Sequence, residues 1–435
     1  MDSAIHAIEV QAAEHPFVKT VVVPGSKSIT NRAMPLAAMA AGGVTTLRGA
    51  LFADDTWHMI GALQQLGLDI VEDAAAKRIR VEAIGRHGVA STQPLYCGNS
   101  GTTIRFLTAL CAAVGGRHIL DGNARMRQRP MAELAAALAQ LGCPLRWGED
   151  EGFPPVIVEG EGLAGGECSF LDVKSSQFIS AVLMAAPLAQ RPVSVRLNGP
   201  VTSEPYVNMT LRMMRQFGAD FSASAVPGGR CITVQPRRYV GGLSYQIEPD
   251  ASNASYFLAA AALVPGSRVR IEGLGSESLQ GDVAFADVLR HMGATVVMEP
   301  TAIEVGGTGF LRGVSLDMNA IPDMVQTLAV LAVFAQGPTT VSNVGNLRLK
   351  ETDRLAALQT ELTKLGAKVS TTSDSIHIVP PGKPTPAVIA TYDDHRMAMA
   401  FAVAGLRIKG IHIENPQCTS KTYPDFFKDF AQLTQ

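Results

Sequence analysis

The chain has 435 residues, of which 47% are hydrophobic and 17% are charged, and its formal net charge is −2. This length suits two or three domains that each bury a core. The small net charge excludes strong electrostatic attraction to nucleic acid or to an anionic membrane, so we expect neither as a partner. Residues 1–15 show no secretory signal, and no stretch resembles a membrane-spanning helix, so we expect a cytoplasmic protein that acts on small molecules.

The first polar motif is PGSKSITNRA, which begins at Pro24 and follows an apolar strand. It resembles a phosphate-binding loop, but Ser26 separates Gly25 from Lys27 and no glycine stands five positions upstream. Successive backbone N–H groups therefore lack the glycines that let them curl around a nucleotide. The motif predicts a helix N-terminus at which Lys27 meets some other anion.

A short phrase then recurs along the chain: LQQLGLDI, LAQLGCPL, MRQFGADF, LRHMGATV and LTKLGAKV. Its glycines are 75, 76, 75 and 73 residues apart, and they are Gly67, Gly142, Gly218, Gly293 and Gly366. Each phrase is typical of the end of an amphipathic helix, closed by a glycine with positive φ and followed by a strand. A predicted hairpin follows each glycine, which indicates a repeat of about 75 residues.

Every repeat also contains two turns that lead from a strand into a helix. The first turns begin at Pro24, Cys97, Val173, Glu248, Asn319 and Tyr392. The second turns are GALFADDT, GNARMRQRP, GPVTSEPY, GLGSESLQGD, GNLRLKETDR and NPQCTSKTYPD. We therefore predict six units, of which the last ends without its hairpin. Residues 1–24 are predicted to complete that unit, which gives an outer domain of residues 1–24 and 248–435 and an inserted domain of residues 25–247.

The unusual polar residues lie mostly at these predicted helix N-termini, which attract anions through unpaired N–H groups and the helix dipole. Lys350 and Arg354 are predicted to share one helix face, either around an anion or as a solvated face balanced by acids. Three arginines within five residues need negative charge nearby, and arginine grips phosphate or carboxylate in a bidentate fork. The remaining cations of this kind are Arg125, Arg127, Arg129, Arg396 and Lys421.

Neutral and acidic groups occupy the same places. Ser175, Ser176 and Gln177 precede an apolar helix, where a serine serves either as an N-cap or as a donor to a phosphate. Asp250 and Asp323 stand among apolar residues, so each either caps a helix or, with a raised pKa, acts as an acid or base.

No metal or cofactor is predicted. His395 has no second His or Cys at ligand spacing, which favours a hydrogen-bonded structural role. The six cysteines form no C-x-x-C pair, and we interpret them as small buried hydrophobic residues: Cys97, Cys111, Cys143, Cys168, Cys231 and Cys418.

Taken together, the motifs resemble those of the 5-enolpyruvylshikimate 3-phosphate (EPSP) synthase family. They run in the family's order from residue 24 to residue 427: PGSKSITNRA, GNSGTTIR, RMRQRPM, SSQF, SEPY, EPDASNASYF, IPDM, NLRLKETDRL, DDHRMAM and CTSKTYPDF. The resemblance implies an α/β (α+β) fold of two domains, each an inverse α/β barrel-like set of three βαβαββ units, with the active site in the cleft between them. It implies transfer of the enolpyruvyl group of phosphoenolpyruvate to the 5-hydroxyl of shikimate 3-phosphate, with release of phosphate.

The resemblance also implies roles for residues at matching positions. Shikimate 3-phosphate would be held by Lys27, Ser28, Arg32, Ser175, Ser176, Gln177, Ser203, Tyr206, Asp323, Asn346 and Lys350. Phosphoenolpyruvate would be held by Lys27, Gly101, Arg125, Gln177, Glu351, Arg354, His395, Arg396 and Lys421. Asp323 is the candidate base and Glu351 the candidate proton donor, while Lys27 stabilises developing charge. Gly101 suits a backbone that approaches a ligand closely, because it lacks a Cβ atom.

The family pattern further implies a monomer that needs no cofactor and whose domains close on their anionic substrates. The pattern has Ala and Pro where this chain has Ser100 and Phe106, so sensitivity to glyphosate, which the family binds in the phosphoenolpyruvate pocket, does not follow. Two alternatives remain at this point. A UDP-N-acetylglucosamine enolpyruvyl transferase would carry a reactive cysteine where residues 125–130 have none. A non-catalytic protein that binds phosphorylated metabolites would not need Asp323 and Glu351 together.

Overall fold

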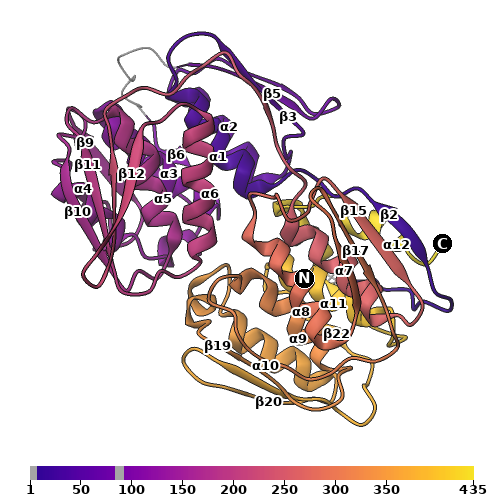
Figure 1. Ribbon diagram of the computed structural model, residues 1–435. Helices are drawn as coiled ribbons and strands as arrows, with labels where there is room; N and C mark the ends of the chain where they lie inside the picture. Colours follow the sequence, from indigo (N-terminus) through magenta and orange to yellow (C-terminus); the bar gives the residue numbers. More distant parts are fainter. Residues whose placement is uncertain (1–6, 84–92) are drawn as a thin grey trace, which may run out of the picture. The chain divides into compact units, whose positions relative to one another are not determined.

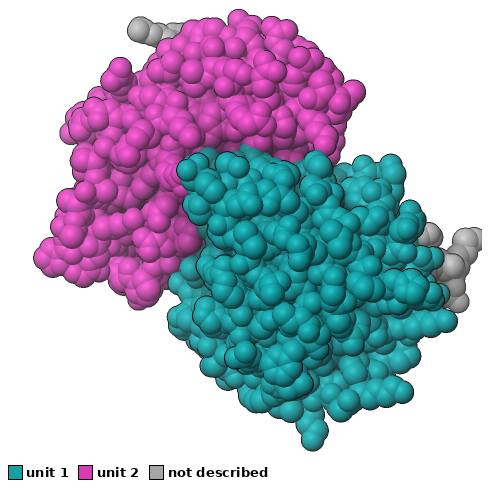
Figure 2. Space-filling model, turned by 45° about the vertical axis from the view of Figure 1, so that its right-hand side comes forward, with its two compact units in different colours: residues 1–24, 248–435 teal, residues 25–247 magenta. Residues whose placement is uncertain are grey.

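The computed structural model describes residues 7–83 and 93–435 (Figure 1). The chain divides into two compact units, shown in Figure 2: unit 1 comprises residues 1–24 and 248–435, and unit 2 comprises residues 25–247. In the described part of the chain, no helix combines the length and the apolar character that spanning a membrane requires.

Unit 2 contains three four-stranded sheets, each with one parallel edge strand and an antiparallel hairpin. Their orders are β14-β3-β5-β4, β6-β7-β9-β8 and β10-β11-β13-β12. The strands are β3 (Val44–Arg48), β4 (Ile70–Asp73), β5 (Arg78–Glu82), β6 (Leu95–Tyr96), β7 (Gly116–Asp121), β8 (Leu145–Trp147), β9 (Val156–Gly160), β10 (Gly166–Leu171), β11 (Val193–Asn198), β12 (Phe221–Val226), β13 (Gly229–Val234) and β14 (Ser244–Gln246). The helices are α1 (Lys27–Ala38), α2 (Asp54–Gln65), α3 (Gly101–Val114), α4 (Ala132–Gln140), α5 (Ser176–Ala185) and α6 (Glu204–Gln216), with short 3₁₀ helices η1 (Met126–Gln128) and η2 (Ala186–Leu188).

Unit 1 repeats the plan with the sheets β2-β15-β17-β16, β18-β19-β21-β20 and β1-β23-β22. The strands are β1 (Ala7–Glu9), β2 (Val18–Val21), β15 (Arg268–Glu272), β16 (Thr295–Met298), β17 (Ala302–Gly306), β18 (Ser315–Asp317), β19 (Thr339–Ser342), β20 (Lys368–Thr371), β21 (Ile376–Val379), β22 (Val388–Ile389) and β23 (His412–Glu414). The helices are α7 (Ala251–Leu263), α8 (Phe285–Met292), α9 (Val325–Ala332), α10 (Arg354–Lys364), α11 (His395–Gly405) and α12 (Phe426–Ala431), with 3₁₀ helices η3 (Gly281–Ala284), η4 (Pro322–Met324), η5 (Gly345–Leu349) and η6 (Pro416–Lys421).

The predicted repeat is confirmed in its local geometry. The five repeat glycines all have positive φ, between 81° and 110°, and each follows a helix and precedes a strand: Gly67, Gly142, Gly218, Gly293 and Gly366. The strand after each glycine pairs antiparallel with the next one along the chain, as in β4 with β5. A left-handed residue is what an αL helix end requires, so glycine at this position sets the direction into each hairpin.

The N-terminal segment behaves only partly as predicted. Strand β1 pairs antiparallel with β23, so it completes the last sheet as expected. Strand β2 pairs instead parallel with β15, so the prediction that all of residues 1–24 belong to the last unit is wrong. The chain leaves unit 1 after β2 and leaves unit 2 after β14, and each of these strands remains at the edge of a sheet in the unit that the chain is leaving.

Central helices form the core of each unit. Every residue of α7, α9 and α11 is buried, and these helices pack on one another in unit 1. In unit 2, α3 packs on α1 and α5, and every residue of α3 from Gly101 to Ala113 is buried. Helices that are apolar on all sides must lie inside the protein, so polar groups are concentrated at their ends. Four cysteines are buried as predicted, but the prediction is wrong for Cys231 and Cys418, which are half-buried.

Candidate active site

The candidate polar residues lie at the N-termini of the central helices, as the sequence predicted. Five side chains cap these ends by accepting a backbone N–H, at 2.8 to 3.4 Å: Ser26 (α1), Ser100 (α3), Ser175 (α5), Asp250 (α7) and Asp394 (α11). Asp250 is therefore a cap, which was one of its two predicted roles. The capped ends still present further N–H groups and the positive end of each helix dipole.

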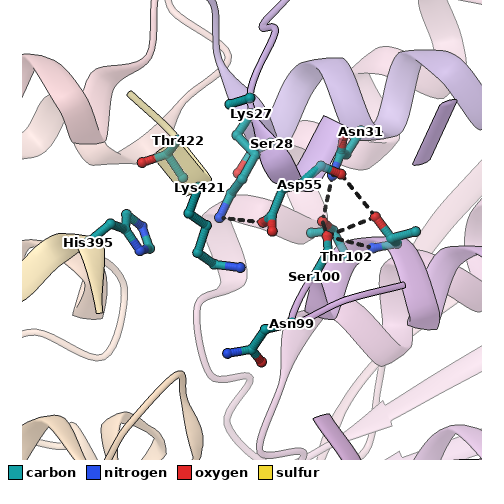
Figure 3. A network of polar contacts seen from close by, with 12 residues as sticks. Lys27, Ser28, Asn31, Asp55, Asn99, Ser100, Thr102, His395, Lys421 and Thr422 are labelled. Carbon is teal, nitrogen blue, oxygen red and sulfur yellow. Dashed lines mark hydrogen bonds and ion pairs between the residues drawn. The ribbon is translucent and has the colours of Figure 1, made fainter. Parts of the chain in front are cut away.

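In unit 2, Lys27 is held by an acid that the sequence analysis did not select. Its Nζ lies 3.3 Å from Oδ2 of Asp55, a buried residue in the first turn of α2 (Figure 3). Asn31 donates to the backbone oxygen of Asp55 at 3.3 Å and to Thr102 Oγ1 at 2.8 Å. Thr103 Oγ1 donates to the same Asp55 oxygen at 3.2 Å. These bonds join the N-terminal turns of α1, α2 and α3, so the position of Lys27 is fixed by three helices.

Gly101 has a close neighbour in a long side chain. A Cβ atom at this position would lie 2.6 Å from Nη2 of Arg129, which is closer than a real contact allows. Arg129 is buried and donates to the backbone oxygen of Asn99 at 3.0 Å. A guanidinium group therefore lies close to Gly101 in this structure, and the close approach of a ligand stays a prediction.

The three arginines of RMRQRP have separate partners. Arg127 forms ion pairs with Asp121 and with Glu149, and the hydrogen bond to Asp121 raises the pKa of Arg127. Arg125 donates to Gln128 at 3.2 Å. The predicted need for nearby negative charge is confirmed for Arg127, which places it in a surface ion pair.

Arg32 is fully buried. Its guanidinium donates to Thr210 Oγ1 at 2.7 Å and to the backbone oxygen of Ser28 at 2.9 Å. The same group lies 5.1 Å from the ring centre of Phe106 and 5.8 Å from that of Tyr206. Burial lowers the pKa of Arg32 to about 10. Arg32 thus ties α1 to α6, and its direct contact with a substrate stays a prediction.

Gln177 in α5 also has a partner that the sequence analysis missed. Its Oε1 accepts from Arg105 Nη1 at 2.6 Å, and the Arg105 guanidinium lies 4.8 Å from the ring centre of Phe178. Next to Gln177, Ser176 is buried. Ser203 is also buried and has a left-handed conformation with φ of 57°, just before α6. The serines and the amide predicted for unit 2 therefore lie at the starts of α5 and α6.

In unit 1, one carboxylate forms ion pairs with three cations. Asp323 Oδ1 lies 3.4 Å from Lys350 Nζ and 3.2 Å from Arg354 Nη1, and Oδ2 lies 2.9 Å from Arg396 Nη2. The expectation of an apolar surrounding for Asp323 is therefore wrong. The prediction that Lys350 and Arg354 share a helix face is also wrong, because α10 begins at Arg354 and Lys350 follows η5 in an extended conformation. The anion between these cations is Asp323.

Arg354 is the centre of this cluster. It is buried, and its guanidinium contacts Asp394 Oδ2 at 2.7 Å and Glu351 Oε2 at 2.9 Å in addition to Asp323. Burial alone would lower the pKa of Arg354, but the charges of these three carboxylates raise it above its ordinary value. Glu351 also lies 3.8 Å from Lys421 Nζ, so this acid stands between two cations.

The last two candidates lie beside the cluster. His395 is buried in the first turn of α11, with Nδ1 3.6 Å from Asp394 Oδ1. Asn346 lies in η5, four residues before Lys350. Within residues 7–83 and 93–435, no three His, Cys, Asp or Glu side chains form a group that could hold a metal ion.

Solved structures identify the class of fold. An EPSP synthase from Acinetobacter baumannii superimposes with a TM-score of 0.79 at 27% identity and covers 98% of both chains. A second structure of EPSP synthase from this organism has a TM-score of 0.77 at 27% identity, covering 98% of this chain and 97% of the other. The fold is thus that of the EPSP synthases, and the predicted α/β class is confirmed.

Sequence comparison identifies the family. The family model described as EPSP synthase (3-phosphoshikimate 1-carboxyvinyltransferase) matches residues 12–430. Relatives named 3-phosphoshikimate 1-carboxyvinyltransferase from Yersinia pestis bv. Antiqua (strain Angola) and Tolumonas auensis are 45% and 44% identical over 423 residues, which is 96% of each chain. The chain belongs to the EPSP synthase family, as its motifs indicated.

Proposed function

We propose that the protein is a 3-phosphoshikimate 1-carboxyvinyltransferase. It transfers the enolpyruvyl group of phosphoenolpyruvate to the 5-hydroxyl of shikimate 3-phosphate and releases phosphate, a step of aromatic amino-acid biosynthesis. The observation that carries this proposal is the family match over residues 12–430. The geometry of each unit agrees with it, because both substrates are polyanions and the capped helix ends are accompanied by clustered cations.

We assign the binding of phosphoenolpyruvate to cations from both units. Unit 2 contributes Lys27 and Arg125, and Gly101 and Gln177 lie at the starts of α3 and α5. Unit 1 contributes the cations that pair with Asp323 and Glu351, and His395 lies beside these cations. A phosphate or carboxylate that reaches these cations competes with Asp323 and Glu351 for their N–H groups, so we expect substrate binding to exchange one set of ion pairs for another. The unit 1 residues are Glu351, Arg354, His395, Arg396 and Lys421.

Shikimate 3-phosphate is assigned to neutral donors and to fewer cations. Hydroxyl groups at the starts of α1, α5 and α6 suit a phosphate and the hydroxyl groups of the ring. Tyr206 lies next to Arg32, and its ring packs over that guanidinium. The proposed set is Lys27, Ser28, Arg32, Ser175, Ser176, Gln177, Ser203, Tyr206, Asp323, Asn346 and Lys350.

The reaction needs one group to remove a proton and one to deliver a proton. We assign the base role to Asp323, which takes the proton of the 5-hydroxyl group of shikimate 3-phosphate. At the same time, the oxygen of that hydroxyl group bonds to C2 of phosphoenolpyruvate. Glu351 protonates the methylene carbon, which gives a tetrahedral ketal phosphate. Elimination then breaks the C2–O bond to phosphate and returns the methyl proton to Glu351, and Lys27 stabilises the negative charge that develops on the departing phosphate.

A phosphate-release assay with purified protein tests the proposal. We expect release only when phosphoenolpyruvate and shikimate 3-phosphate are both present, and equal amounts of phosphate and EPSP. UDP-N-acetylglucosamine serves as the competing acceptor, and phosphate release with it would favour the alternative enolpyruvyl transferase. Calorimetric binding of both substrates without turnover would favour a non-catalytic binding protein. A cytoplasmic location, a monomeric state and the absence of a cofactor belong to the same proposal.

A further inference from the structure

We infer that Asp282, acting through Ser252, is a positioning residue for Arg396. The inference rests on the proposed function in one respect, namely that Arg396 binds phosphoenolpyruvate. Neither Asp282 nor Ser252 belongs to the set of residues assigned above. Both are buried, and they lie in different elements of unit 1: Ser252 in the first turn of α7 and Asp282 in η3.

A chain of short contacts connects the two residues to Arg396. Ser252 Oγ lies 2.5 Å from Asp282 Oδ2. Arg396 Nη2 lies 3.2 Å from Ser252 Oγ and 2.9 Å from Asp323 Oδ2. One guanidinium nitrogen is therefore held between a serine hydroxyl and a carboxylate, and a second carboxylate stands behind the serine.

Counting protons fixes the direction of these bonds. A guanidinium has only donors and an ionised carboxylate has only acceptors, whereas a serine hydroxyl has one proton and two lone pairs. Because Asp282 accepts the serine proton, the oxygen of Ser252 is left to accept from Arg396. Asp282 thus sets the hydroxyl in the one orientation that receives the guanidinium, and its charge strengthens that acceptor through the hydrogen bond.

The arrangement gives Arg396 a fixed contact that does not change during the reaction. Asp323, its other partner on Nη2, is the proposed base and is expected to exchange partners when substrates bind. Arg396 Nη1 lies 3.4 Å from the hydroxyl of Tyr256, which is a long contact. The Ser252–Asp282 pair therefore supplies the anchor that keeps the guanidinium oriented for a bidentate contact with an incoming anion.

Steady-state kinetics of the full chain test the inference. In Asp282→Ala we expect the KM for phosphoenolpyruvate to rise about tenfold, because misplacement of a substrate-binding group weakens its contact. The KM for shikimate 3-phosphate should stay within about twofold. Ser252→Ala should show the same selective change. Asp282→Asn retains a side-chain oxygen that can accept the serine proton, so it should recover most of the loss.

Three comparisons make the result decisive. Asp287→Ala removes an exposed acid of α8 that pairs with Arg290, and it should leave both KM values unchanged. The double variant Ser252→Ala/Asp282→Ala should be no worse than either single variant, because both remove the same anchor. If Asp282→Ala does not fold, Ser252→Ala with Asp282→Asn carries the test. Unchanged KM for phosphoenolpyruvate in Ser252→Ala, or additive losses in the double variant, would overturn the inference. Turnover by the unmodified protein reports separately on the proposed function.

Discussion

Replacing Arg354 by Gln tests how much the charged cluster of unit 1 contributes to stability. Arg354 is buried, and it is the shared partner of Asp323, Glu351 and Asp394. Asp394 is completely buried. Without the guanidinium of Arg354, the charge of its carboxylate would therefore lack its closest cation at a site that water does not reach. Removing one partner from a buried ion pair costs about 3–5 kcal/mol, since the remaining charge is left uncompensated. We expect a loss in this range for Arg354→Gln.

Differential scanning calorimetry measures the loss. A change of 1 kcal/mol shifts Tm by about 2–4 °C for a unit of about 150–250 residues, so Arg354→Gln should melt about 6–20 °C lower. The matched control is Arg290→Gln, because Arg290 pairs with Asp287 at the surface of α8. Exposed pairs contribute about 0–1 kcal/mol, so this control should lose no more than a few degrees. Equal losses in the two variants would show that Arg354 acts only as a surface charge, contrary to our reasoning.

Three substitutions test the assigned roles, and a labelling experiment tests the environment of a cysteine. Lys27→Met should raise the KM of both substrates about tenfold or more. If calorimetry shows that this variant binds phosphoenolpyruvate with unchanged affinity, Lys27 does not belong to the site. Asp323→Ala should lower kcat by about a hundredfold or more, and unchanged turnover would exclude the base role. Gly101→Ala should raise the KM for phosphoenolpyruvate about tenfold, because the new Cβ atom displaces the guanidinium of Arg129. Normal kinetics would mean that this guanidinium has no role in binding. Burial raises the pKa of Cys418 to about 12, so only about one thiol in ten thousand is ionised at pH 8. Iodoacetamide should therefore label Cys418 slowly, and the labelling rate should rise about tenfold per pH unit. Rapid labelling with loss of activity would contradict this.

Much of the fold could be predicted because its signals are local. The helix ends, the glycines with positive φ and the hairpins after them depend on residues within a few positions of one another, as at Gly67 and the β4–β5 hairpin. The pairing of β2 could not be predicted in this way. A parallel edge strand is chosen by the sheet that accepts it, and β15 lies about 250 residues further along the chain. Local patterns do not distinguish among sheets of the same design.

The residues of the candidate site also differ in whether a local sequence signal predicts them. Residues at helix N-termini, such as Ser175 and Asp250, were identifiable because capping is a local interaction. Their partners were not: Asp55 meets Lys27 from a different helix, and Asp282 meets Ser252 from 30 residues away. The acidic residues of the second turns were visible as GALFADDT and LQGD, but nothing in one sequence indicates which cation or hydroxyl such an acid will face. The sequence therefore located the ends of the elements, and the structure shows how those ends meet.

The balance of charge in unit 1 explains how its cations can lie together before any substrate binds. Cations alone would repel one another, but here each is matched by a carboxylate at 2.7 to 3.8 Å. Four cations face three carboxylates, namely Lys350, Arg354, Arg396 and Lys421 against Asp323, Glu351 and Asp394. These carboxylates offset the repulsion among the cations, so the cations can lie together without destabilising the fold. Of the acids, Asp394 is committed as the cap of α11, so only Asp323 and Glu351 can release their cations to an incoming phosphate. Those two acids are also the ones that we propose as base and proton donor, and the same displacement that admits the substrate would leave them able to exchange protons.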